Sequence, residues 1–140
     1  MIPNRVAVLV KGASLNFDKM ANPILKEYGL TSAQYKILKY LFMHEDESVR
    51  LVDIENYYSI THPTTIGLIQ QLETKGFVRK EENPEDARSK VIKLTDKALE
   101  ERNVVEDIGI ELEKKLTTAL SDSEREQLIG LLQKMLTAFD

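Results

Sequence analysis

Residues 61–95 read THPTTIGLIQQLETKGFVRKEENPEDARSKVIKLT, and the apolar period changes once within this stretch. The first half predicts a helix with an inward stripe of Thr65, Leu68, Ile69 and Leu72. Thr61 can cap this helix, and Gly76 can end it. The second half predicts two short strands, 77–80 and 91–94, around a polar hairpin. A helix that leads directly into a hairpin is typical of the second half of a winged helix-turn-helix.

Two further short helices precede this stretch. Thr31-Ser32-Ala33-Gln34 is a capping box, and the helix that it opens carries Ile37, Leu38, Leu41 and Phe42. Another short helix is expected over 51–58. Three short helices followed by a hairpin indicate a winged helix-turn-helix. The expected fold class is therefore mainly α with a small β-hairpin wing (α+β).

Amphipathic helices flank these elements on both sides. The apolar stripe from Val6 to Ile24 predicts a long first helix, with a kink or break expected at Pro23. Thr95 can cap a second long helix, and a capping box at Ser121 opens a last one. Since one small subunit has little to cover these helices, they indicate a symmetric homodimer. The candidate interface residues are Val6, Leu9, Val10, Leu128, Leu131, Leu132, Met135, Leu136 and Phe139.

Composition limits the class of protein. The 140 residues contain no cysteine, which excludes disulfides and thiolate metal sites. Neither a signal peptide nor a membrane span is expected, so the predicted location is cytoplasmic. The net charge of −4 argues at first sight against a nucleic-acid partner. However, residues 75–97 carry seven basic and five acidic side chains, whereas residues 98–140 carry five basic and ten acidic ones, so a local basic patch can coexist with an acidic remainder.

The predicted helix at 61–75 would enter the major groove of DNA with its first residues against base edges. Its outward candidates for DNA contact are Thr61, His62, Pro63, Thr64, Gly67, Gln70 and Gln71. Glutamine can pair with adenine, and threonine can meet base edges or a thymine methyl group. Gly67 would let the backbone approach the DNA closely. Taken alone, such a face is more typical of a solvated helix, and the hairpin that follows favours DNA contact.

The hairpin adds four candidates for DNA contact: Asp86, Arg88, Ser89 and Lys90. Arg88 is long and permanently charged, and a narrow minor groove attracts such a side chain. Asp86 can order the Arg88 side chain through a charge-assisted bond. Ser89 and Lys90 are suited to phosphate contacts, which position a protein without reading sequence. The alternative is a solvated turn with a chance ion pair, since exposed pairs contribute little stability.

Three segments resemble motifs of the multiple antibiotic resistance regulator (MarR) family. Residues 86–95 (DARSKVIKLT) resemble its wing signature, and 72–78 (LETKGFV) is similar to its bridge from recognition helix to wing. Residues 28–35 (YGLTSAQY) match its Gly-Leu-Thr-x-x-Gln junction. The resemblance implies an obligate homodimer on a pseudo-palindromic operator. It also implies that the Arg88 side chain enters the minor groove and that Asp86 orients it.

One departure from the family pattern lies on the recognition helix. Members often carry arginine there, whereas this chain has Gly67 and Gln71, so major-groove reading depends less on arginine. The expected organisation is one domain, 1–140, with a DNA-binding lobe at 31–95 and dimerisation helices at 1–28 and 96–140.

The family resemblance also implies an effector site. Many members bind small aromatic or amphipathic effectors between the dimer helices and the DNA-binding lobe. Met20, Tyr35 and His44 lie on helices that would border such a space, although each also suits a core or surface role. No cofactor is expected. Neither His44 nor His62 has a partner at metal-ligand spacing, and no catalytic grouping is visible, so neither a metal site nor an enzyme is expected.

The sequence therefore predicts a homodimeric, sequence-specific regulator of transcription that binds double-stranded DNA. Its most direct role is that of a repressor, which a small effector can modulate. The alternative is a winged-helix module whose face binds another protein, a role with which the acidic balance and the arginine-poor recognition helix are compatible.

Overall fold

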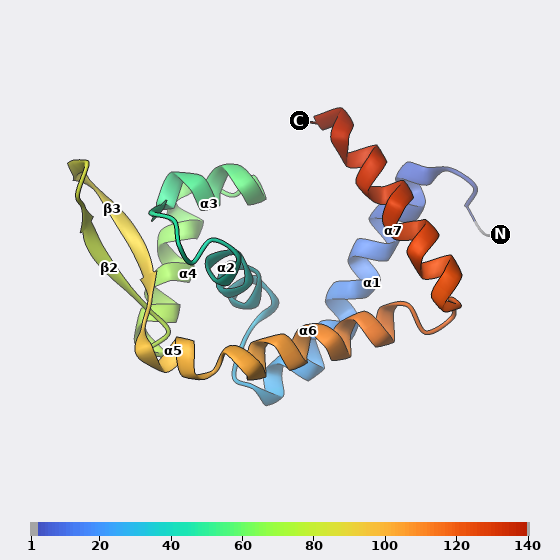
Figure 1. Ribbon diagram of the computed structural model, residues 1–140, viewed down its shortest axis with the longest axis horizontal. Helices are drawn as coiled ribbons and strands as arrows, with labels where there is room; N and C mark the ends of the chain where they lie inside the picture. Colours follow the sequence, from blue (N-terminus) through green and yellow to red (C-terminus); the bar gives the residue numbers. More distant parts are fainter. Residues whose placement is uncertain (1–2, 140) are drawn as a thin grey trace.

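The computed structural model describes residues 3–139, which form seven α-helices and a small three-stranded antiparallel sheet at one end of the molecule (Figure 1). In chain order the elements are α1 (Val6–Glu27), α2 (Ser32–Met43), β1 (Val49–Arg50), α3 (Leu51–Tyr58), α4 (His62–Thr74), β2 (Val78–Asn83), β3 (Asp86–Leu94), α5 (Asp96–Glu100), α6 (Arg102–Leu116), α7 (Asp122–Leu136) and the 3-10 turn η1 (Thr137–Phe139). The prediction of a mainly helical fold with a hairpin wing is confirmed. No helix within these residues is both long enough and apolar enough to cross a bilayer.

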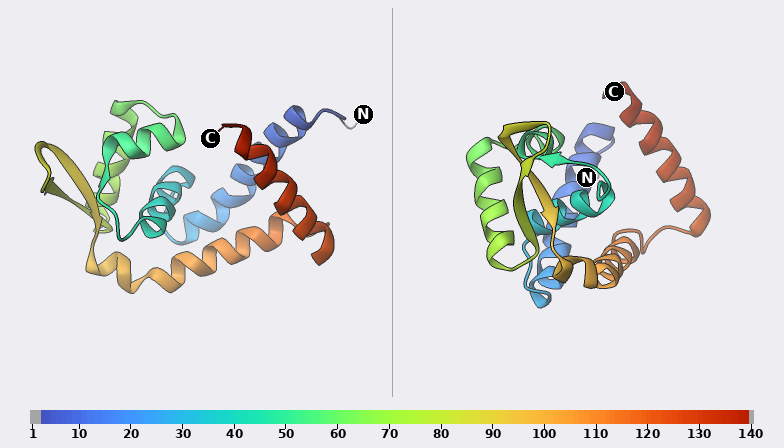
Figure 2. Two further views of the ribbon diagram at one scale, coloured as in Figure 1. Left: turned by 45° about the horizontal axis from the view of Figure 1, so that its top comes forward. Right: turned by 60° about the vertical axis from the view of Figure 1, so that its left-hand side comes forward.

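The molecule has a winged lobe, made of α2, β1, α3, α4, β2 and β3, and a set of long terminal helices. The β2–β3 hairpin extends beyond the rest of the lobe, whereas α1 and α7 lie on the opposite side (Figures 1 and 2). Helix α6 packs against α1, which also packs against α2. Helix α7 turns back from the end of α6 and stands apart from the winged lobe in both views of Figure 2. The hairpin is therefore the part of the chain farthest from α7.

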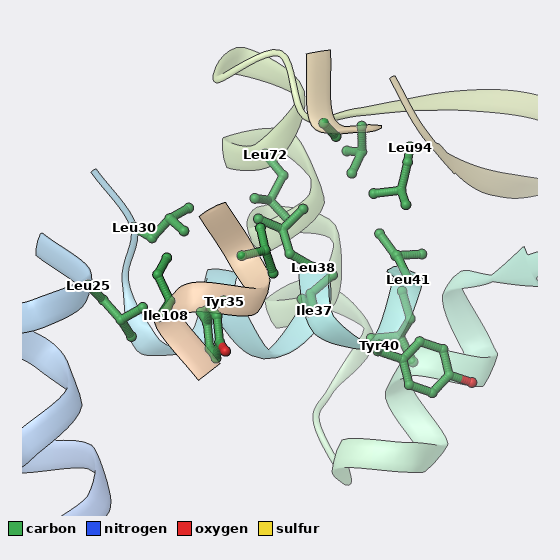
Figure 3. Packing of buried hydrophobic residues seen from close by; sticks show 14 of the residues in the cluster. Leu25, Leu30, Tyr35, Ile37, Leu38, Tyr40, Leu41, Leu72, Leu94 and Ile108 are labelled. Carbon is green, nitrogen blue, oxygen red and sulfur yellow. The ribbon is translucent and has the colours of Figure 1, made fainter. Parts of the chain in front are cut away.

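A single hydrophobic core joins the winged lobe to α1 and α6 (Figure 3). Its largest fully buried apolar side chains are Leu25, Ile37, Leu38, Ile54, Ile69, Leu72, Ile92, Ile108 and Val91. Burying one side chain of this size is worth about 1.5–3 kcal/mol. Because Ile69 and Leu72 of α4 belong to this core, the core decides which face of α4 is left to solvent.

Side-chain caps begin the helices where the sequence predicted them. The Thr31 hydroxyl accepts from the backbone amide of Gln34, and the Gln34 side chain accepts from the backbone amide of Thr31, both at 3.1 Å. The same reciprocal box at Ser121 opens α7. Gly29 and Gly76 follow α1 and α4 with φ of 72° and 83°, a left-handed conformation that favours glycine. These four predictions are confirmed, because each depends on neighbours within a few residues.

The sheet is larger than the sequence predicted. The strand β1 adds to the hairpin, with Val49 opposite Ile92. Strands β2 and β3 also continue through most of the segment expected to be a polar loop, leaving a turn at Pro84-Glu85. Most side chains near the hairpin tip are exposed, so no apolar alternation marks these residues as strands. With two residues, β1 is too short to show any period.

Two terminal helices differ from the prediction. Helix α1 continues through Pro23, and the helix expected after Thr95 is divided at Glu101 into α5 and α6. Neither glycine nor proline marks the division. The guanidinium of Arg102, the first residue of α6, donates to the Glu45 carboxylate at 2.7 Å and lies over the Phe42 ring. Contacts with the winged lobe therefore accompany the change of helix direction, and they cannot be recognised in a local pattern.

Candidate nucleic-acid interface

Helix α4 leaves a polar face to solvent. Its residues Thr65, Ile69 and Leu72 are buried in the core. Of the residues predicted to contact DNA, the exposed ones are Thr61, His62, Pro63, Thr64, Gln70 and Gln71, and Gly67 is partly exposed. A methyl group added at Gly67 would meet open space. The backbone of α4 is thus accessible at the middle of its exposed face.

The first turn of α4 offers hydrogen-bond donors. Thr61 caps the helix by accepting from the backbone amide of Thr64 at 3.3 Å, and its hydroxyl donates to the Thr64 hydroxyl at 2.9 Å. The hydroxyl hydrogen of Thr64 can therefore donate outward. The start of a helix also carries partial positive charge. This turn can consequently hold a phosphate or meet a base edge.

His62 begins α4 and is held by Glu55 of α3. Its Nδ1 lies 3.0 Å from Oε1 and 3.3 Å from Oε2 of Glu55. The imidazole is 60% exposed, whereas the Glu55 side chain is 15% exposed. Glu55 was not predicted from the sequence, because the two residues meet only through the turn between α3 and α4, where Ser59 adopts a left-handed φ of 54°.

Each histidine has one carboxylate neighbour. His44 pairs with Glu47 at 2.8 Å on another part of the lobe. Over residues 3–139, no three potential metal ligands among His, Asp and Glu gather at one place.

The side chain of Gln71 contacts a residue of α2. Its Oε1 accepts at 2.8 Å from the side-chain amide of Gln34, which is 3% exposed. The ammonium of Lys75 donates to the Gln34 oxygen at 2.6 Å and to the Gly29 carbonyl. These bonds satisfy a buried amide, which would otherwise lose its hydrogen bonds to water. Gln71 therefore ties α4 to α2 through its side-chain oxygen, and its contact with a base stays a prediction.

The hairpin tip presents Arg88 to solvent. Its side chain is 94% exposed. The Asp86 carboxylate accepts from the backbone amide of Arg88 at 3.0 Å and lies 3.5 Å from its Nε. Asp86 therefore orders the backbone next to Arg88 first, and the guanidinium only loosely. The structure thus brings these two residues together as the sequence predicted.

Ser89 and Lys90 are both engaged within the hairpin. The Ser89 hydroxyl donates to the Asp86 carbonyl at 3.2 Å and accepts from the Asn83 side chain at 3.0 Å. Ser89 therefore closes the turn, and its contact with a phosphate stays a prediction. Lys90 lies 3.9 Å from Glu82, a contact loose enough for its ammonium to reach a phosphate instead.

Arg50 is a further cation of the winged lobe, and it was not predicted from the sequence. It precedes α3 in β1, opposite Val91 of the hairpin, and is about half exposed. Its guanidinium donates to Asp53 at 3.0 Å, and this hydrogen bond raises the pKa of Arg50. The spacing of Arg50 and Asp53, three residues apart at the start of α3, is the sequence feature that could have indicated this ion pair. Arg50 can therefore supply a positioned charge beside the hairpin.

A cavity of about 900 Å³ lies between the winged lobe and the terminal helices. Its lining includes Tyr35, and burial followed by the charge of Glu106 raises the pKa of Tyr35 to about 12. The other two predicted effector residues lie elsewhere: His44 lines a separate hollow of about 120 Å³, and Met20 borders neither space. The structure therefore does not bring Met20, Tyr35 and His44 together as one pocket.

The predicted dimer residues form uncovered apolar faces on α1, on α7 and on the turn η1 that follows α7. Along α7, within the described part of the chain, no residue is buried. The exposed residues are Val6, Leu9, Val10, Leu128, Leu131, Leu132, Leu136 and Phe139, and Met135 is half-buried. Phe139 is 82% exposed. Removing such an apolar side chain from water would lower the free energy of the protein.

Comparisons with known proteins agree on one class. A family model described as transcriptional regulator SarA/Rot matches residues 19–108. The HTH-type transcriptional regulator BilQ of Clostridioides difficile is 27% identical over 114 residues, or 81% of this chain and 76% of that protein. The S. aureus MepR–DNA complex is similar with a TM-score of 0.80 and 28% identity, covering 99% of this chain and all of that one. A mutant MarR from E. coli complexed with operator DNA is similar with a TM-score of 0.79 and 25% identity, covering 94% and 93% of the two chains.

Proposed function

The chain belongs to the MarR/SarA family of winged helix-turn-helix transcriptional regulators, and from this premise we propose that it binds a pseudo-palindromic operator as a homodimer and represses transcription. The observation that carries the proposal is the pairing, within one lobe, of the exposed start of α4 with the solvent-directed Arg88 of the wing. The first element suits base edges and the second a minor groove. In this division of labour, residues 31–95 bind DNA, and the helices of 1–28 and 96–140 hold two subunits together.

The uncovered faces of α1 and α7 support the homodimer. Large apolar patches on soluble chains mark interaction sites. A second copy would cover the same faces on both subunits, since a twofold interface is self-complementary. Two recognition helices spaced about 34 Å apart, or a multiple of this, would then meet successive major grooves on one side of the DNA.

The large cavity supports modulation by a small aromatic or amphipathic effector. Phe17, Ile110 and Leu116 provide apolar lining, and the Tyr35 hydroxyl stays protonated at ordinary pH and can donate a hydrogen bond. The ion pair of Lys39 and Glu106, at 3.9 Å, is loose enough to open for a polar group. The winged lobes of the two subunits can lie at different distances from each other. An effector in this space would change DNA affinity only if it bound the dimer better at one of these distances than at another.

A binding titration tests the proposal. The full chain is mixed with labelled duplexes from the DNA that flanks its own coding region, and fluorescence anisotropy is recorded between 50 and 300 mM salt, roughly the range over which phosphate contacts are screened. We expect tight binding to one duplex and a steep loss of affinity as salt rises. Binding to a protein partner with no affinity for any flanking duplex would instead favour the winged-helix protein-interaction module.

Repression is tested separately, because binding alone does not reveal the direction of control. A reporter gene is placed behind the duplex that binds most tightly, with and without the protein. We expect lower reporter output when the protein is present, since an occupied operator excludes polymerase. Higher output would identify an activator.

A further inference from the structure

The His62–Glu55 pair places an exposed imidazole at the N-terminal end of α4. In the proposed function this end of the helix faces the DNA. Both carboxylate oxygens of Glu55 face the same ring nitrogen, Nδ1, at 3.0 and 3.3 Å. Glu55 is largely buried, whereas the imidazole is 60% exposed. The ring is therefore held from the protein side and open on its other side.

This contact determines where the ring carries its proton. An ionised carboxylate can only accept hydrogen bonds, so the Nδ1 that faces Glu55 must carry the hydrogen. In a neutral imidazole the other nitrogen, Nε2, then has a free lone pair and acts as an acceptor. Without the carboxylate, His62 could adopt either tautomer and could present Nε2 as a donor instead.

We infer that Glu55 is a positioning residue that makes Nε2 of His62 an acceptor for the exocyclic amino group of adenine or cytosine in the major groove. The inference rests on the proposed DNA binding. In the major groove the hydrogen-bond donors are adenine N6 and cytosine N4, whereas guanine and thymine offer acceptors. A lone pair on Nε2 would therefore select adenine or cytosine on the contacted strand, and it would be repelled by guanine, thymine and phosphate oxygens.

A histidine acceptor oriented by Glu55 suits a recognition helix that has no arginine. The described residues of α4 include no arginine or lysine between His62 and Thr74, so guanine is not favoured there by a charged donor. The side-chain oxygen of Gln71 already accepts a hydrogen bond from Gln34. Within the first turn, the Glu55 carboxylate sets the hydrogen-bonding character of the His62 ring.

The test has one readout that needs no DNA. Above pH 8 imidazoles are mostly neutral, and ring ¹⁵N chemical shifts of the full chain report the tautomer of each histidine. We expect His62 to carry its hydrogen on Nδ1 in the unaltered protein, and to lose this bias in Glu55→Gln, which keeps the size of the side chain. A hydrogen on Nε2 of His62 in the unaltered protein would overturn the inference.

The second readout is binding-site selection from random duplexes. We expect the unaltered protein to prefer adenine or cytosine at one position in each half-site, and this preference to fall ~10-fold in both Glu55→Gln and His62→Ala. The matched control is Glu47→Gln, which removes the carboxylate from the His44 pair and should leave the selected sequences unchanged. Selection by Glu55→Gln that equals that of the unaltered protein contradicts the inference alone. Failure of the unaltered protein to bind any duplex contradicts the proposed function as well.

Discussion

At the tip of the β2–β3 hairpin, Arg88 has almost its whole side chain in water, and Asp86 orders the backbone that carries it. An exposed arginine contributes little to the stability of the fold. Its exposed position is instead suited to contact with a polyanion such as DNA. Arg88 can thus be removed without disturbing the core, which makes it a clean probe of DNA binding.

We predict that Arg88→Ala lowers operator affinity at least ~10-fold, because a cation in a phosphate-lined groove is lost. In a dimer the plot of log K against log salt should become shallower by about two, one for each lost charge. Fluorescence anisotropy over a salt series measures both quantities. Lys115→Ala, which removes an exposed cation from the last turn of α6, is the matched control and should change neither.

A substitution at Gly67 should change fold stability and operator affinity in opposite directions. Since a methyl group there meets open space, Gly67→Ala should stabilise α4 by about 0.5–1 kcal/mol through its higher helix propensity. If the α4 backbone approaches the DNA, the same methyl group should weaken operator binding. Thermal unfolding and anisotropy titration of one sample measure the two effects. Undiminished DNA affinity would show that α4 keeps its distance from the groove at this point.

At the scale of elements, α2 and α4 are joined by a partly buried polar contact at the edge of the apolar core. The Gln34 side chain closes the cap of α2 and bonds both Gln71 and Lys75 of the helix that would read DNA. Lys75 in turn reaches the Gly29 carbonyl at the end of α1. The junction between α1 and α2 is therefore bonded directly to the C-terminal end of α4.

We predict that Gln34→Ala lowers the free energy of unfolding by about 1–3 kcal/mol, because Gln71 and Lys75 lose a largely buried partner. Urea denaturation at one fixed protein concentration measures the change. Gln70→Ala, on the exposed face of the same helix, should stay within about 0.5 kcal/mol of the unaltered protein. An equal effect of the two substitutions would mean that the polar junction contributes no stability.

At the scale of the whole molecule, the apolar surface is unevenly distributed. The winged lobe buries its apolar side chains around one core, whereas α7 leaves a row of leucines in water. A chain that isolated a helix in this way would gain by pairing, since each buried leucine is worth about 1.5–3 kcal/mol. The separation of the two DNA-reading lobes would then be set by the terminal helices.

We predict that Leu131→Glu, at a position 65% exposed in the single chain, converts the protein from a dimer to a monomer. A charge buried without a partner at an interface costs more than the lost leucine contact. Light scattering at micromolar concentration should show the mass of one chain instead of two, and operator affinity should fall with it. Met43→Glu, equally exposed on α2, is the control and should stay dimeric. A dimeric Leu131→Glu would place the interface elsewhere.

Sequence alone was sufficient for the helix caps and for the order of the elements, although the break expected at Pro23 does not occur. The caps at Thr31 and Ser121, the left-handed Gly29 and the order of helices and hairpin all follow from residue type and spacing over a few positions. The pairing of Asp86 with Arg88 was likewise predictable, because the two residues lie two positions apart at the start of β3, next to the hairpin turn.

Only the tertiary structure could decide contacts between segments distant along the chain. The bond of Gln71 to Gln34 spans 37 residues, and that of Arg102 to Glu45 spans 57. Periodicity shows which side of a helix faces inward, but a polar residue at the edge of that side turns toward water or toward a buried partner according to the packed neighbour. Gln71 therefore looked like a reader of bases, whereas packing of α2 against α4 gave its side chain a buried amide to satisfy.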